Sequence, residues 1–363
     1  MPFKIENSKV SKIYLIGKEI RERELNSKDI FLKLNQGVNR VKNPEIEEFI
    51  KNIDFEERHF SYPPNNGLFP LRKVINEEFF DGKADSEDIV ISPGSVGALD
   101  MIFQLLDIDN FYIPTFFWGP YKIMSDRRGL NCKYYDGFIE NLDSRDGIII
   151  CDPNNPTGEK LDDDKLYEWI KILDSKGVII IFDSPYRRLF TDRSDTFFQK
   201  LSKLENVVIV ESFSKSLSLP GGRIGFIHST NKPFTKEISS RFLYSCGGVS
   251  TFAQVIVENL LSNPLGIEKI KEFKKNTTSH IKKNLSWLYD NGLIERSIYK
   301  RRPEGLFAIV NRSERDLMKN FIGAVELPFF TEVKEYKEKY ANCSRICVSV
   351  DHGEFVRYLE RVL

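Results

Sequence analysis

Short apolar runs alternate with amphipathic segments between about residues 50 and 240, and this alternation constrains the fold more than any other feature of the chain. Runs such as GVIIIF and NVVIVE contain no polar residue in their interior, which is typical of strands covered on both faces. Seven strands are predicted, at 88–92, 110–113, 132–136, 147–151, 177–182, 206–211 and 223–227. Helices are predicted between them, at 95–106, 118–128, 162–176 and 195–203. The predicted fold class is therefore α/β, with a large domain in which a mostly parallel seven-stranded sheet lies between helices.

A second, smaller domain of α+β type is predicted from the N- and C-terminal segments. Long helical patterns dominate from about 233 to 290, and the short strands GLFAIV and RICVSV come after them. Further helical segments belong to this part, near 312–323 and 332–340. We expect three sections: an N-terminal arm with part of the small domain (1–45), the large domain (46–245), and a connecting helix with the rest of the small domain (246–363).

Composition excludes several classes of partner. Lys plus Arg and Asp plus Glu are 53 each, so no overall charge favours nucleic acid or an anionic membrane. No apolar run approaches the roughly 20 residues that span a bilayer, and MPFKIENSKV lacks the apolar core of a signal peptide. The five cysteines form no CxxC pair, which favours reduced thiols and a cytoplasmic location. The four histidines have no metal-ligand spacing, so no metal is expected.

Ligands of α/β proteins bind at the carboxyl ends of strands, so functional residues are expected in the loops that follow the predicted strands. In SPGSVGALDMI, small residues follow a strand and open a helix. The free backbone N–H groups at the start of this helix, from Gly94 to Gly97, would form an anion cradle, although an ordinary strand–helix turn has the same pattern. In CDPNNPTG, two asparagines lie between prolines in a rigid turn, where Asn155 either points its amide at a ligand oxygen or only shapes the turn.

Two more loops carry groups suited to a flat ring. In IIIFDSPYRRLF, Asp183 ends an apolar strand, where a carboxylate needs a partner such as a cationic ring nitrogen. Tyr186, three residues later, would donate to a phenolic oxygen on the same ring. In IPTFFWGPY, the rings of Phe116, Phe117, Trp118 and Tyr121 gather in one loop, which suits either stacking on a cofactor or packing in the core or at an interface.

The segment SFSKSLSLPGGRIGF carries a lysine directly after a buried strand. Ser212 and Ser214 supply hydroxyl donors and Arg223 a guanidinium fork, which together suit a phosphate. Lys215 lies among them, and a lysine whose pKa is lowered by a low-polarity or cationic site forms Schiff bases with carbonyl groups. This lysine is therefore a candidate for covalent chemistry.

The order and spacing of these motifs resemble those of the fold type I pyridoxal-phosphate enzymes, within the class I/II aminotransferase superfamily. The resemblance covers nearly the whole chain. PNNPTG and SFSKSLSLPGGRIGF are most similar to the branch that includes histidinol-phosphate aminotransferases and threonine-phosphate decarboxylases. It implies pyridoxal 5'-phosphate as the cofactor, and an aminotransferase that moves an amino group between an L-amino acid and a 2-oxo acid.

The resemblance also assigns roles to individual residues around the cofactor. Lys215 takes the place of the Schiff-base lysine, which also moves the proton of the substrate Cα. Asp183 takes the place of the aspartate paired with the pyridine nitrogen, and Tyr186 and Asn155 the places of the donors to the phenolate oxygen. Phe116 stands at the ring-stacking position, with Trp118 as its rival. The phosphate ligands implied are Ser95, Val96, Ser212, Ser214 and Arg223.

Further roles implied by the resemblance concern the substrate and a second subunit. SRICVSV is similar to the strand whose arginine binds the substrate α-carboxylate, which makes Arg345 that residue. In LNQGV, Gly37 would lie beside the same carboxylate. In YPPNNGLFPLR, Tyr62 would reach the phosphate of the neighbouring subunit, which implies a homodimer. Arg241 matches an arginine that binds distal carboxylates in aspartate-specific members, although a solvated helix residue is the favoured interpretation.

The sequence departs from the family pattern at two places, and other activities stay open. Gly94 and Val96 replace hydroxyl residues of many relatives, and Ser-Pro follows Asp183, which leaves the substrate unassigned. The same scaffold supports decarboxylation, elimination, cyclisation or oxidation of amino acids. Arg345 favours cleavage of the Cα–H bond and hence transamination. A non-catalytic sensor is the remote alternative, because no basic helix-turn-helix segment precedes the fold and the charge is balanced.

Overall fold

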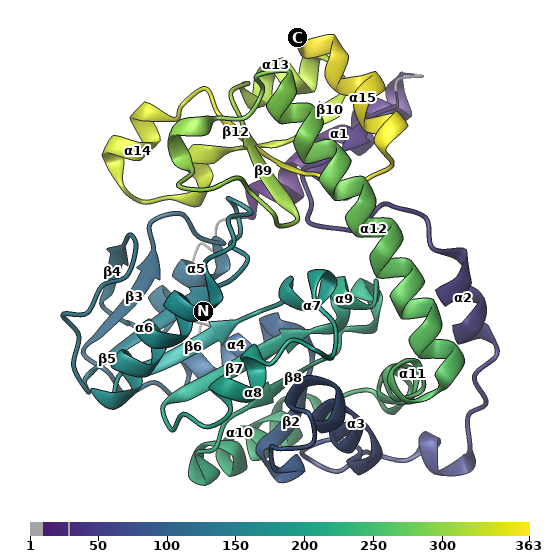
Figure 1. The fold of residues 1–363 in the computed structure, drawn as a ribbon, viewed down its shortest axis with the longest axis vertical. Coiled ribbons are helices and arrows are strands. Elements are labelled where there is room, and N and C mark those ends of the chain that lie inside the picture. The colour runs from purple at the N-terminus through teal and green to yellow at the C-terminus, as the bar shows by residue number, and fades with distance from the viewer. Residues whose placement is uncertain (1–9, 28–29) are drawn as a thin grey trace, which may run out of the picture.

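The computed structural model describes residues 10–27 and 30–363, and Figure 1 shows a larger part below a smaller one. The larger part contains a seven-stranded sheet with the strand order β2-β8-β7-β6-β5-β3-β4. Strand β8 is antiparallel to both of its neighbours, and the other adjacent strands are parallel. The predicted α/β class and mostly parallel seven-stranded sheet are confirmed. Its strands are β2 (Ile89–Ser92), β3 (Asn110–Pro114), β4 (Cys132–Tyr135), β5 (Asp146–Cys151), β6 (Ile179–Asp183), β7 (Val207–Ser212) and β8 (Gly225–His228).

Two layers of helices bury the two faces of this sheet. Because side chains alternate along a strand, Ile148 and Ile150 pack into one apolar cluster and Ile149 into the other. Both clusters consist of fully buried aliphatic and aromatic side chains, as expected for strands without a solvent-facing side. One face is covered by α4 (Gly94–Phe103), α5 (Pro120–Arg127) and α10 (Lys232–Cys246), and the other by α3 (Phe69–Phe80), α6 (Asp163–Ser175) and α8 (Phe197–Leu201).

Helix α6 shows how the local sequence sets the limits of these helices. The Asp162 side chain accepts a hydrogen bond from the backbone N–H of Lys165 at 3.2 Å and so caps the helix start. Acidic residues occupy the first turn, where they interact favourably with the helix dipole. The helix ends before Gly177, whose φ of 76° is a left-handed conformation that glycine adopts without strain.

The smaller part joins segments from both ends of the chain. A three-stranded antiparallel sheet has the order β11-β12-β9, and the short β1 pairs in parallel with β10. Leu32 pairs with Ile322 in that second sheet, so the N-terminal segment lies beside the C-terminal one. The strands are β1 (Leu32–Lys33), β9 (Phe307–Val310), β10 (Ile322–Gly323), β11 (Val325–Glu326) and β12 (Ser344–Cys347). The helices are α1 (Lys12–Asn26), α13 (Glu314–Lys319), α14 (Lys334–Lys339) and α15 (His352–Leu359).

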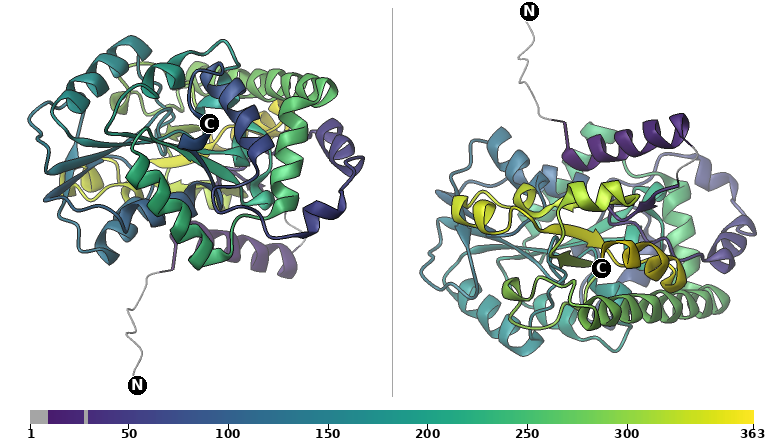
Figure 2. Two further views of the ribbon diagram at one scale, coloured as in Figure 1. Left: turned by 90° about the horizontal axis from the view of Figure 1, so that it is seen from below. Right: turned by 90° about the horizontal axis from the view of Figure 1, so that it is seen from above.

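Helix α12 (Pro264–Asp290) runs from the larger part to the smaller part, as Figures 1 and 2 show. It contacts α11 (Thr251–Ser262) and α2 (Pro44–Lys51) near its start and α15 near its end. Within the described residues, no helix combines the length and apolar character needed to cross a membrane. The domain limits given above stay a prediction, and residues 1–9 and 28–29 of the predicted N-terminal section lie outside the described residues.

The parallel strands bring three loops to one edge of the large sheet. In the strand register, Cys151 at the end of β5 is opposite Asp183 at the end of β6, and Asp183 is opposite Val210 of β7. The chain continues from these strands into the Asn155 loop, α7 (Arg187–Phe190) and α9 (Phe213–Ser216). This arrangement puts the polar residues of three separate sequence motifs next to one another.

Candidate active site

A cavity of about 290 Å³ lies at this edge of the sheet and is also lined by the smaller part. Most of the residues singled out in the sequence line it, although they come from segments more than 300 residues apart. Ile13, Gln36, Val38, Pro185 and Phe307, which the sequence did not indicate, line it as well. The predicted residues at the cavity are Gly37, Ser95, Val96, Asn155, Asp183, Tyr186, Ser212, Ser214, Lys215, Arg223 and Arg345.

Asp183 is a buried carboxylate with one oxygen unpaired. The Tyr121 hydroxyl donates a hydrogen bond to Oδ2, whereas Oδ1 has no hydrogen-bond partner among the described residues. Burial raises the pKa of Asp183 to about 7, and the hydrogen bond from Tyr121 acts in the opposite direction. A cationic group beside Oδ1 would therefore stabilise the ionised form of Asp183. Tyr121 was visible in the sequence only as one ring of an aromatic cluster.

A chain of hydrogen bonds joins Tyr186, Asn155 and Arg345. Asn155 Nδ2 donates to the Tyr186 hydroxyl at 2.9 Å, and Arg345 Nη1 donates to Asn155 Oδ1 at 3.1 Å. These contacts orient the Asn155 amide, because its oxygen is occupied by a cation. Asn155 lies in the loop after β5, Tyr186 in the loop after β6 and Arg345 in strand β12, so these hydrogen bonds connect the seven-stranded sheet with the three-stranded sheet.

Arg345 is a fully buried arginine with unused donor capacity. Its guanidinium carbon lies 4.6 Å from the ring centroids of both Phe307 and Phe330, and Nη2 donates to the backbone oxygen of Asn35. Nε has no partner in the described part of the chain. Burial lowers the pKa of Arg345 to about 10, so the side chain is still charged at neutral pH. A buried cation of this kind is suited to a carboxylate ligand.

Lys215 follows the end of β7 in the short helix α9 and has no fixed partner. Its ε-amine makes no hydrogen bond or ion pair with any residue that the structure describes. Burial lowers the pKa of Lys215 to about 8, and the charges of Arg223 and Arg345 act in the same direction. A substantial fraction of the amine is consequently neutral near physiological pH, which is the state required of a nucleophile or a base.

Donors suited to an anion gather on the side of the cavity near α4. Ser95 and Val96 occupy the first turn of α4, and the Ser212 and Ser214 hydroxyl oxygens lie 3.0 Å apart. Gly94 leaves room for a neighbouring arginine: a Cβ at this position would lie 3.0 Å from Nη2 of Arg223.

Two predicted residues lie outside the cavity. The Phe116 ring stacks on Tyr336 of α14 at a centroid distance of 5.4 Å and an interplanar angle of 9°. Trp118, the rival for the stacking position, lines the cavity and meets Tyr121 edge-on. Tyr62 lies on the surface with 92% of its area exposed.

Gly37 lines the cavity, whereas Arg241 does not. A Cβ at Gly37 would lie 2.5 Å from Cζ of Phe307, so only glycine allows this segment to approach the ring. Arg241 pairs with Glu237 at 2.8 Å on the same helix and donates to Gln104, as expected for a solvated helix residue.

The residues at the cavity fit a flat, cationic heterocycle that carries an aldehyde and a phosphate. The unpaired Oδ1 of Asp183 suits the ring nitrogen, and the unpaired amine of Lys215 suits the aldehyde. The hydroxyls, N–H groups and guanidinium near α4 suit the phosphate. Two of these groups, Oδ1 of Asp183 and the amine of Lys215, lack other partners in the described part of the chain, whereas Ser212, Ser214 and Arg223 also contact neighbouring residues.

Comparisons with known proteins agree with this set of groups. The sequence model of the family described as aminotransferase class I and II matches residues 29–361. Over 228 residues, the chain is 25% identical to the LL-diaminopimelate aminotransferase of Chlamydia pneumoniae, which covers 58% of this chain and 57% of that protein. Over 198 residues, it is 29% identical to the histidinol-phosphate aminotransferase of Pyrococcus furiosus, and the match covers 52% of this chain and 54% of that protein. The chain thus spans little more than half the length of these relatives.

A solved structure extends the likeness of the fold to nearly the whole chain. A double mutant of Thermus thermophilus aspartate aminotransferase superposes with a TM-score of 0.80 at 18% identity, over 98% of this chain and 97% of that chain. At this identity the likeness shows the fold alone. Because the relatives carry the names of different substrates, the histidinol-phosphate branch stays a prediction.

Proposed function

Because the chain belongs to the class I and II aminotransferase family, whose members use pyridoxal 5'-phosphate, we propose that it transfers an amino group between an L-amino acid and a 2-oxo acid. The observation that carries this proposal is the pairing of two unsatisfied groups in one cavity: the buried Oδ1 of Asp183 and the amine of Lys215. The Asp183 carboxylate requires a cation, and the Lys215 amine requires an electrophile. The cofactor supplies the first with its ring nitrogen and the second with its aldehyde. When bound, the cofactor supplies a ring that accepts the electron pair released at the substrate Cα.

In this proposal the chain holds the cofactor from several sides. Asp183 binds the ring nitrogen, and Tyr186 with Asn155 binds the phenolate oxygen. Trp118 replaces Phe116 as the ring-stacking residue, because Trp118 alone of the two lines the cavity. The phosphate is bound by Ser95, Val96, Ser212, Ser214 and Arg223.

Lys215 moves the substrate proton, and Asp183 keeps the ring nitrogen cationic. Opposite a cationic ring nitrogen, the Asp183 carboxylate stays ionised, since the opposite charge offsets the effect of burial on its pKa. Nζ of Lys215 attaches the cofactor and, once displaced by substrate, takes the proton from the substrate Cα. Its pKa of about 8 suits this exchange near neutral pH.

Arg345 orients the substrate. Its buried guanidinium, held by Asn35 and Asn155, binds the α-carboxylate and keeps it in place during the reaction. A carboxylate held by a buried cation is a poor leaving group, so this contact favours Cα–H cleavage over decarboxylation. Gly37 lies at the same cavity and leaves room for the carboxylate.

We also propose that the working form is a cytoplasmic homodimer. Tyr62 is 92% exposed, and Phe55, Phe60 and Phe252 form an exposed aromatic cluster with centroid distances of 5.1 and 5.2 Å. A second copy would cover this surface and bring its Tyr62 to the phosphate. The five cysteines are free in the described residues, which supports a reducing compartment. Sedimentation of the native protein tests the dimer, and Tyr62→Phe should weaken cofactor binding several-fold.

A single-turnover experiment tests the activity. The cofactor-loaded protein is mixed with one amino donor at a time, including the amino acids diaminopimelate and aspartate and the amino alcohol ester histidinol phosphate, while absorbance and products are followed. A transaminase forms about one equivalent of carbonyl product per subunit, releases no carbon dioxide and keeps the amino group until a 2-oxo acid is added. Release of carbon dioxide would instead identify a decarboxylase. Inertness toward every substrate would favour a sensor.

A further inference from the structure

A second and larger cavity, of about 650 Å³, lies behind the candidate active site. It is formed by α12, by the loop after β5 with α7, and by the loop at 302–304 of the smaller part. Among the described residues the two cavities share no lining side chain. The proposed transamination does not use this second cavity.

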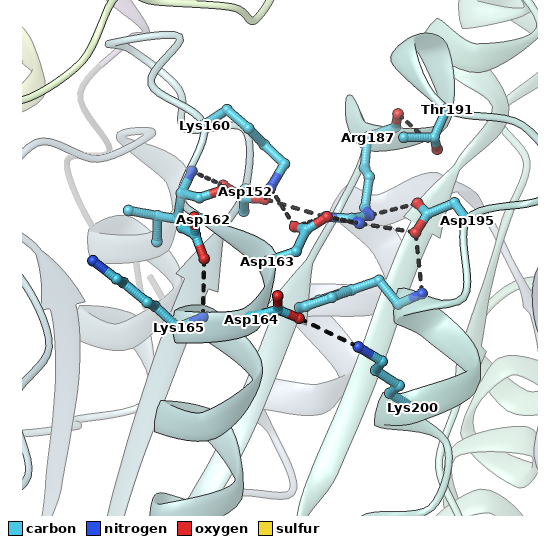
Figure 3. A network of polar contacts seen from close by, with 12 residues as sticks. Asp152, Lys160, Asp162, Asp163, Asp164, Lys165, Arg187, Thr191, Asp195 and Lys200 are labelled. Carbon is cyan, nitrogen blue, oxygen red and sulfur yellow. Dashed lines mark hydrogen bonds and ion pairs between the residues drawn. The ribbon is translucent and has the colours of Figure 1, made fainter.

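Two of the cations that line the second cavity already have carboxylate partners. Figure 3 shows the network around Arg187, whose nitrogens donate to Asp163 and Asp195 at 2.8 Å. Lys160 pairs with Asp152 at 2.8 Å and also with Asp163. These side chains are fixed and neutralised, so they form a wall of the cavity and leave little charge for a ligand.

Two other cations at the cavity lack carboxylate partners. Neither Lys282 of α12 nor Arg302 forms an ion pair within residues 10–27 and 30–363. The guanidinium of Arg302 lies 4.0 Å from the ring centroid of Tyr289, so stacking holds the guanidinium in place. Glu304 is the one acidic side chain among the described lining residues, and it also lacks a cationic partner.

Apolar side chains complete the cavity beside these charges. Phe190 of α7, Leu285 of α12 and Pro303 line it. A mostly apolar cavity with a few unpaired polar groups is typical of small-molecule sites. We infer that this cavity binds a small molecule with an anionic head group, a carboxylate or a phosphate, on a flat apolar body. The head group binds Lys282 and Arg302, and the body lies against Phe190 and Leu285.

The position of the cavity links this ligand to the candidate active site. Pro153 lines the second cavity, and Asn155, two residues later, lines the first. Likewise, Arg187 lines the second cavity and its neighbour Tyr186 lines the first. A ligand in the second cavity therefore lies against the segments that hold the proposed cofactor ligands, and we expect this contact to couple the two sites. This coupling rests on the proposed function, whereas the binding itself does not.

Calorimetric titration of the cofactor-loaded protein tests the binding. Phenyl phosphate and phenylacetate are the probes, and uncharged benzyl alcohol is the matched control probe. We expect one site for phenyl phosphate that weakens at least tenfold in the Lys282→Ala/Arg302→Ala double variant. Arg345 also suits a carboxylate, so for phenylacetate the measured quantity is the part of the binding that this double variant removes. Lys283→Ala, the neighbouring exposed lysine outside the cavity, should bind as the native protein does. Comparing the two probes tells a phosphate site from a carboxylate site.

A substitution of Glu304 should strengthen probe binding, whereas the double variant should weaken it. Glu304→Gln removes the carboxylate from the cavity, so a charged probe should bind two- to threefold more tightly. Affinity that is unchanged in the double variant, or weaker in Glu304→Gln, would overturn the inferred site. Equal binding of benzyl alcohol would do the same.

Cofactor absorbance tests the coupling separately. Phenyl phosphate should shift the absorbance maximum or its pH midpoint in the native protein and in Lys283→Ala, but not in the Lys282→Ala/Arg302→Ala double variant. Binding without any such shift would refute the coupling. A protein that binds the probe but transaminates no amino acid would refute the proposed function and leave the site standing.

Discussion

Replacing Asp183 by asparagine should stabilise the cofactor-free protein at alkaline pH while it weakens cofactor binding. Burial raises the pKa of Asp183 from its ordinary value of 3.8 to about 7 in the folded chain. Between these values the folded state holds a proton that the unfolded state has released, so the stability of the native protein falls as pH rises. Well above pH 7, the full loss of folding free energy from the buried, ionised Asp183 is present. Asparagine carries no charge and avoids it.

The magnitude follows from the difference in pKa. About three pKa units correspond to roughly 4 kcal/mol, of which roughly 3 kcal/mol develops between pH 5 and pH 8. The Tyr121 hydroxyl still has an oxygen acceptor in Asp183→Asn, but the new amide N–H groups lack an acceptor, which costs about 1–3 kcal/mol at every pH. The stability of the variant relative to the native protein should therefore rise by roughly 3 kcal/mol over this pH range.

Urea unfolding of the cofactor-free proteins at one concentration and several pH values measures this difference. Asp152→Asn is the matched control, because Asp152 is equally buried but pairs with Lys160 and Arg187. Lys160 and Arg187 keep Asp163 and Asp195 as partners, so removing the Asp152 charge should destabilise the protein by less than the roughly 3–5 kcal/mol of an uncompensated buried charge. A relative stability of Asp183→Asn that is flat from pH 5 to pH 8 would refute the assignment of Asp183 as a strained carboxylate.

Three further substitutions probe the same cavity. Trp118→Leu should weaken cofactor binding about tenfold in an absorbance titration, whereas Phe116→Leu should change it less than twofold; equal effects would reject Trp118 as the stacking residue. Gly37→Ala should raise KM for the amino acid at least tenfold with the cofactor absorbance unchanged, and a normal KM would contradict the close approach seen here. Tyr121→Phe removes the hydrogen bond that lowers the pKa of Asp183, so carbon-13 NMR of the cofactor-free protein should find a midpoint about one unit higher. A midpoint that stays in place would show that this hydrogen bond is unimportant.

The sequence predicted the large sheet and most of the site because both depend on local signals. Each strand of the sheet is a short segment with its own pattern, and a parallel sheet necessarily gathers the loops at its carboxyl edge. Asp183 ends one such strand and Lys215 follows the end of the next, so the prediction of the two strands also predicted that these residues lie close together. Helix α3 was not predicted, because its buried Arg72 and Asn76 interrupt the apolar pattern.

The remaining features depend on contacts between distant segments. Whether Phe116 or Trp118 faces the cavity depends on Tyr336, more than 200 residues further along the chain. The hydrogen bond from Tyr121 to Asp183 joins two motifs that the sequence analysis read separately. Tyr62 is exposed and does not line the cavity in a single chain, so its predicted role requires a second copy.

Borohydride reduction of the cofactor-loaded protein, followed by peptide mass spectrometry, tests the central claim most directly. The account predicts one phosphopyridoxyl group per subunit, attached to Nζ of Lys215 and absent from Lys215→Ala. A label on another lysine, or no label in protein that retains bound cofactor, would contradict it.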